Sequence, residues 1–81
     1  MNVALKERAL TALVAAPPTV QKTFLKQMNF LARNLHHPSL RAKKYDESHG
    51  LWQGRVNDDW RFFFTIEDGA YLIHSVVPHP K

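Results

Sequence analysis

The chain has 81 residues, no cysteine and a formal net charge of +4, from eleven lysines and arginines against seven acidic residues. This length is typical of a single domain, residues 1–81, and the lack of cysteine excludes disulfides and thiolate metal sites. No apolar run approaches the roughly 20 residues of a membrane-spanning helix, and no signal peptide follows Met1, so we expect a cytoplasmic protein. A basic domain of this size is typical of proteins that bind nucleic acid or another polyanion, although a solvated basic surface would give the same count.

The first half of the chain predicts two helices. Residues 3–16 place apolar side chains, among them Leu10 and Val14, near the 3.6-residue spacing of a helix. Residues 18–34 repeat this pattern, and two prolines at 17–18 separate the segments. Because the connection is short, we expect an antiparallel helix hairpin that lays its apolar stripe on a sheet.

A long polar connection follows at residues 35–50. It brings three cations and an aromatic ring close together in the sequence: Arg41, Lys43, Lys44 and Tyr45. Connections of this length without regular structure are more often functional than incidental. We expect Leu40 and Tyr45 to anchor this loop on the core.

The second half predicts a meander of three antiparallel strands. Residues 50–56 and 60–66 alternate apolar with polar side chains and are joined by the polar turn 57–59. A second turn at 67–69, which ends in glycine, leads to the third strand at 70–77. The segment 60–66 should therefore lie in the centre of the sheet.

Each of the first two predicted strands carries an arginine that faces away from the apolar residues of its own strand. If the strands pair, Arg55 and Arg61 share the face of the sheet opposite the core. Two guanidinium groups on a rigid sheet suit a phosphate ligand, because each planar fork donates two hydrogen bonds and stays charged at physiological pH. The same arginines would also fit surface ion pairs with Asp58, Asp59 or Glu67.

Histidines supply the candidate proton-transfer groups. His74 and His79 can both exchange a proton near neutral pH, and we favour His79 because it follows the last strand with a freer approach. Without a function, His74 would be a strand histidine with one satisfied hydrogen bond, and His79 would be a solvated residue of the chain's tail. None of the five histidines shows the i, i+4 pairing of a hydrolytic zinc site, and the adjacent His36 and His37 would point opposite ways in an extended chain. We therefore expect no metal and no cofactor.

Several local strings, together with the order of the elements, resemble the RelE/ParE toxin superfamily, and within it the RelE- and HigB-like branches. The strings are Ala15-Ala-Pro-Pro-Thr-Val-Gln21, His37-Pro-Ser-Leu-Arg-Ala-Lys-Lys44, Leu51-Trp-Gln-Gly-Arg-Val56 and Asp59-Trp-Arg-Phe62. The resemblance extends from about residue 5 to residue 80. It implies an α+β, RelE-like fold in which the N-terminal helix hairpin packs on an antiparallel sheet. The sheet would have three strands, or four if a short strand precedes the first helix, as it does in most members.

The resemblance also implies a function: a bacterial toxin that a cognate antitoxin protein neutralises. RelE-like members cleave mRNA on the ribosome without a metal, by attack of a ribose 2′-hydroxyl on the adjacent phosphate. Arg55 and Arg61 match the strand arginines of the family's site, His79 falls near its C-terminal functional residue, and these three are the expected catalytic residues. Lys43 and Lys44 match the basic loop that would lie along the RNA. We expect Arg41, Tyr45 and His74 to bind RNA as well. The sequence lacks the tyrosine that often follows the last strand in the family. Two alternatives therefore stay open, a ParE-like toxin that poisons DNA gyrase without catalysis and an inactive relative that only binds an antitoxin.

Overall fold

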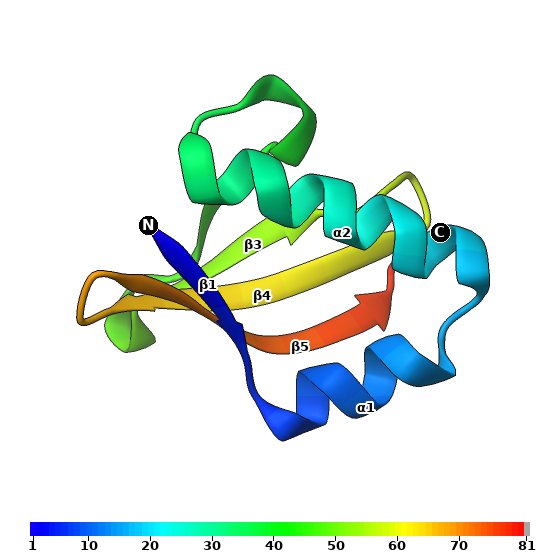
Figure 1. Ribbon diagram of the computed structural model, residues 1–81. Helices are drawn as coiled ribbons and strands as arrows, with labels where there is room; N and C mark the ends of the chain where they lie inside the picture. Colours follow the sequence, from blue (N-terminus) through cyan, green and yellow to red (C-terminus); the bar gives the residue numbers. More distant parts are fainter. Residues whose placement is uncertain (81) are drawn as a thin grey trace.

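The computed structural model describes residues 1–80, which form two helices and one five-stranded mixed sheet (Figure 1). In chain order the elements are β1 (Asn2–Leu5), α1 (Glu7–Ala15), α2 (Pro18–Arg33), β2 (Lys43–Asp46), β3 (Leu51–Arg55), β4 (Trp60–Glu67) and β5 (Ala70–Pro78), with short 3-10 turns at Pro38–Leu40 and Glu47–His49. The strand order across the sheet is β1-β5-β4-β3-β2. Within residues 1–80, no helix is long and apolar enough to cross a membrane.

The central meander agrees with the prediction from the sequence. Strands β3, β4 and β5 pair antiparallel, and β4 lies in the middle of the sheet. The turn between β4 and β5 places Asp68 and Gly69 at φ values of 50° and 75°. A two-residue hairpin loop with both central residues at positive φ matches the twist of the flanking strands, which is why Asp-Gly occurs there.

The sheet extends the predicted three-stranded meander by one strand at each edge, and the strand before the first helix, which the resemblance allowed, is one of them. Asn2–Leu5, which we expected to begin the first helix, pairs parallel with β5, so that Val3 lies beside Tyr71 and the helix begins only at Glu7. The connection at 35–50 also contains a strand, β2, whose Lys43 and Lys44 pair antiparallel with β3. Charged residues are common on edge strands because they discourage pairing with further chains. β2 is mostly charged, so it lacks the alternating apolar residues from which a strand is predicted.

The core lies between the helices and one face of the sheet. From α2, Phe24 and Leu31 are fully buried, and Phe24 meets the ring of Phe62 edge-on with 6.0 Å between centroids. The sheet supplies further buried side chains from β4 and β5: Phe62, Phe64, Ile73 and Val76. Gly54 is required on this face, because a Cβ there would collide with the ring of Phe62. The two helices run in opposite directions in Figure 1, as expected of a hairpin.

Two details of the predicted packing differ from the structure. Leu10 and Val14 of α1 are 51% and 70% exposed, because the helix turns the neighbouring pair Ala9 and Leu13 toward the core. Leu40 anchors the long connection in the core as predicted, whereas Tyr45 is 61% exposed. Tyr45 lies on the opposite side of the sheet from the core.

Candidate functional site

Arg55 and Arg61 lie on the face of the sheet that the core does not use. They are direct cross-strand partners in the β3–β4 register. Their neighbours Gly54 and Phe62 are also partners and are buried in the core, so the alternation of side chains puts both arginines on the opposite face. The two arginines are therefore neighbours on the face opposite the core, as the sequence predicts, and each is half-buried.

A cleft of about 230 Å³ opens over this pair. Its lining residues are Arg41, Lys43, Gln53, Gly54, Arg55, Arg61 and His79. Three of them come from segments outside β3 and β4. Arg41 follows the turn Pro38–Leu40 with a left-handed φ of 45°, and Lys43 lies opposite Gln53 at the start of β2. The cleft thus joins five of the eight predicted site residues, four cations and one histidine, in one hollow.

The third outside segment is the end of the chain after β5. The backbone N–H of His79 donates to the carbonyl of Asp59 with an N···O distance of 2.6 Å. This bond ties the segment after β5 to the turn between β3 and β4. It brings His79, an exposed side chain, to the wall of the cleft beside the arginines.

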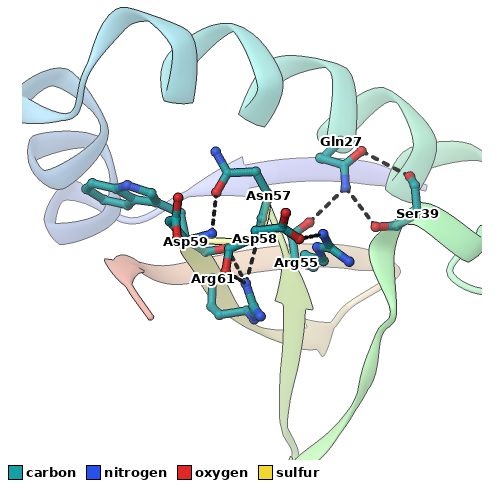
Figure 2. Close-up of polar contacts among 8 residues, drawn as sticks. Gln27, Ser39, Arg55, Asn57, Asp58, Asp59 and Arg61 are labelled. Atoms are coloured by element: carbon teal, nitrogen blue, oxygen red, sulfur yellow. Dashed lines mark hydrogen bonds and ion pairs between the residues drawn. The ribbon is translucent and has the colours of Figure 1, made fainter. Parts of the chain in front are cut away.

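The guanidinium of Arg61 is held by the turn between β3 and β4. Its Nη1 donates to the carbonyls of Asn57 at 2.6 Å, Trp60 at 3.0 Å and Asp58 at 3.3 Å (Figure 2). The turn is itself closed by the Asn57 side chain, which accepts from the N–H of Asp59 at 2.9 Å. Carbonyl oxygens orient the guanidinium without neutralising its charge, and the five N–H groups of an arginine leave donors for a ligand.

Arg55 differs, because its Nη2 forms an ion pair with Asp58 (Figure 2). One of the ion pairs considered from the sequence is therefore present. The Asp58 side chain is 84% exposed, and an ion pair with an exposed partner contributes little to stability. Glu67, another of the considered partners, lies elsewhere and accepts from the Thr65 hydroxyl at 2.6 Å.

Comparison with known proteins identifies the fold. No protein-family model and no curated protein sequence matches the chain. Among solved structures, a chain of the archaeal RelE–RelB complex from Pyrococcus horikoshii OT3 has a TM-score of 0.80 and 18% identity, over 95% of this chain and 92% of that one. The YoeB/ParE toxin from Agrobacterium tumefaciens has a TM-score of 0.81 and 9% identity, over 99% and 100%. The chain has the RelE/ParE toxin fold.

A third structure extends this likeness to a complex. A chain of the heterotetrameric YoeB–YefM toxin–antitoxin complex from Staphylococcus aureus has a TM-score of 0.77 and 18% identity, over 99% of this chain and 98% of that one. The likeness covers nearly the whole RelE/ParE fold, and the expected resemblance in architecture is confirmed. At such low sequence identity the likeness shows the backbone fold alone. The chemistry of the cleft must therefore be inferred from the side chains of this chain.

One buried polar residue supports the cleft from beneath. Gln27 of α2 is only 4% exposed, and its Nε2 donates to the carbonyls of Ser39 at 3.1 Å and Arg55 at 2.8 Å. The Ser39 hydroxyl donates back to Gln27 Oε1 at 3.1 Å (Figure 2). A single side chain thus ties α2 to the turn before Arg41 and to the end of β3. The sequence carried a signal for it, since Gln27 interrupts the apolar stripe between Phe24 and Leu31.

The remaining three predicted site residues lie outside the cleft. Lys44 points to the other face of β2, where its ammonium lies 5.9 Å from the centre of the Trp52 ring. Tyr45 and His74 line a second hollow on the same face as the arginines. The His74 Nε2 lies 2.8 Å from the Thr65 hydroxyl, which fixes the orientation of the ring.

Within residues 1–80, no three histidine or acidic side chains come together in a way that would hold a metal ion. The carboxyl of Asp46, at the end of β2, has a perturbed pKa. Hydrogen bonds from the side chains of Ser48 and His49 lower the pKa of this carboxyl below the usual value. The same carboxyl caps the short turn Glu47–His49 by accepting from the backbone N–H of Ser48.

Proposed function

We propose that this protein is the toxin of a type II toxin–antitoxin system, and that it is a metal-independent endoribonuclease that cuts mRNA on the ribosome in the cytoplasm. One observation carries the proposal. Arg55, Arg61 and His79 line the same cleft, together with Arg41 and Lys43, on the face of a RelE/ParE-type sheet that the core leaves open. The fold supplies the expectation of a toxin, and the cations supply a site for a phosphate.

The cleft fits an internal transesterification. The 2′-oxygen of a ribose forms a bond to the adjacent phosphorus while the bond to the 5′-oxygen breaks, which gives a 2′,3′-cyclic phosphate and a 5′-hydroxyl. The 2′-hydroxyl loses a proton and the leaving 5′-oxygen gains one. Such a step requires in-line placement, proton exchange and a cation beside the charge that develops on the phosphorane.

Each role has a candidate in the cleft. Arg61 is already oriented by three carbonyls, so its guanidinium stabilises the phosphorane without rearrangement of the turn. Arg55 orients the phosphate, and binding would draw it away from the exposed Asp58. His79 supplies the imidazole of the cleft and is the candidate for proton transfer. Arg41 and Lys43 then contact flanking phosphates, whereas Lys44 faces away from this track.

The proposal includes a cognate antitoxin as partner. The RelE–RelB and YoeB–YefM structures are complexes of a toxin with a second protein, and this chain matches them over nearly its whole length. Two surfaces are candidates for the antitoxin: the open edges of the sheet at β1 and β2, and the helix hairpin. Amide exchange in the purified complex should show protection of one of these surfaces, and protection of neither would contradict this part of the proposal.

The test is to express the protein and map the 5′ ends of cellular mRNA. Cuts that follow the codon phase of translated regions are expected. Intact mRNA with broken DNA would instead support a gyrase poison, and intact mRNA and DNA would support a relative that only binds its antitoxin. Lys44→Ala is the control variant. It removes one cation of the basic loop on the face away from the cleft, so the cuts in mRNA should persist.

A further inference from the structure

A second hollow, of about 350 Å³, lies on the same face of the sheet as the cationic cleft. It is lined by Arg8, Tyr45, Leu51, Phe63, His74 and Ser75. The proposed reaction uses none of these side chains to move a proton or to hold the scissile phosphate. The second hollow is therefore separate from the proposed catalytic site, and its lining determines which ligand it would bind.

Its floor is an aromatic pair built from two strands. The Tyr45 ring meets the Phe63 ring edge-on, with 4.9 Å between centroids and 71° between planes. Phe63 is half-buried in the sheet, whereas Tyr45 is exposed. An edge-on contact fixes the position of the Tyr45 ring and leaves ring surface open to a ligand. An exposed, supported aromatic ring beside cations is the arrangement on which nucleic-acid bases stack.

The wall of the hollow is polar. His74 is oriented by the Thr65 hydroxyl at 2.8 Å, and Arg8 and Ser75 add further hydrogen-bonding groups. Unstacked RNA bases are recognised by this combination, in which a ring or guanidinium plane takes the face of the base and polar groups take its edge. An apolar ligand would leave these polar groups unused.

The register of the sheet sets the spacing between the two hollows. Phe63 lies opposite Gln53, and two residues further along the strands Arg61 lies opposite Arg55. Two residues of strand place the backbone of Phe63 about 7 Å from that of Arg61, at roughly 3.4 Å per residue. The Tyr45 ring lies next to the Phe63 ring, with 4.9 Å between their centroids. A flexible single strand can bridge this distance within one nucleotide step.

We propose that Tyr45, supported by Phe63, forms a nucleobase-stacking site for the nucleotide next to the phosphate held by Arg55 and Arg61. This inference rests on the proposed function, since it assumes that the cleft binds RNA. It assigns the second hollow to a base rather than to a phosphate. Binding there depends on the ring and not on charge.

The test is a double-mutant cycle between the protein and the RNA. The probe is a fluorescent 2′-O-methylated tetranucleotide, which the 2′-hydroxyl mechanism cannot cleave, together with four versions that each lack one base. Wild type and Tyr45→Leu are titrated with each probe. We expect Tyr45→Leu to weaken binding of the intact probe about tenfold. Removal of one particular base should weaken wild type by a similar factor and leave Tyr45→Leu unaffected.

Two variants separate stacking from charge and from misfolding. Tyr45→Trp should keep the affinity of wild type, because it preserves an aromatic face. Lys43→Ala should weaken binding of all five probes alike and reduce the dependence on salt, whereas Tyr45→Leu should leave that dependence unchanged. If the losses from Tyr45→Leu and from base removal add at every position, the base site is wrong and the proposed function stands. If wild type binds none of the probes at low salt, both are wrong.

Discussion

At the scale of single residues, Arg61 is the side chain on which the proposed chemistry depends most. Arg61→Ala removes a guanidinium that is half-buried on the face away from the core, so we expect the fold to persist. Loss of one electrostatic stabiliser of a transition state typically lowers a rate by about 10²–10³-fold, and we expect a similar loss of mRNA cleavage. The measurement is the rate of cleavage on translating ribosomes, with growth arrest as the cellular readout.

Arg61→Lys is the matched variant for this prediction. It keeps the charge but loses the planar fork that the carbonyls of Asn57, Asp58 and Trp60 orient. A partial recovery of cleavage is expected. An Arg61→Ala protein that cleaves as fast as wild type would remove this residue from the mechanism, whatever its effect on growth.

At the scale of elements, Gln27 links α2, the turn Pro38–Leu40 and the end of β3. Gln27→Met keeps the length of the side chain but leaves the carbonyls of Ser39 and Arg55 without their shared donor. Loss of such buried partners costs about 1–3 kcal/mol, so the free energy of unfolding should fall by that amount in urea titrations. Cleavage should also fall, because the segments that carry Arg41 and Arg55 lose their common support.

Ser39→Ala is the control, since it removes the hydroxyl that donates to Gln27 Oε1 and leaves both bonds from Nε2 intact. Its effect on unfolding should be the smaller of the two. Equal effects of the two variants would place the stabilisation in the serine hydroxyl rather than in the link between α2 and β3.

The elements that sequence reasoning found are those whose signals are local. The alternation along 60–66 and the turn at Asp68 and Gly69 define the central hairpin without reference to the rest of the chain. The residue pattern alone did not predict β1, because Val3 and Leu5 fit a helical spacing as well as a strand, and its partner β5 is distant in sequence. β2 was missed because its residues are mostly charged. The arginine pair was predictable from the alternation along the strands. The contribution of Gln27 was not, because it depends on the carbonyls of Ser39 and Arg55 both lying within reach of one side chain.

At the scale of the whole molecule, two sources of affinity for RNA make different predictions. A net charge of +4 spread over the surface would let any lysine contribute equally. The structure instead gathers Arg41, Lys43, Arg55 and Arg61 in one cleft and turns Lys44 away. The position of a cation, rather than its mere presence, should therefore decide its effect on binding.

The dependence of RNA affinity on salt distinguishes these two cases. Each phosphate contact with a single strand contributes about −0.7 to the slope of log affinity against log salt, so three or four contacts give about −2 to −3. Affinity for a short RNA should then fall about 20- to 50-fold between 50 and 200 mM salt. Lys43→Ala should make the slope shallower by about 0.7, and Lys44→Ala should leave it unchanged. Equal changes from the two neighbouring lysines would show that binding follows the overall charge of the surface and not the cleft.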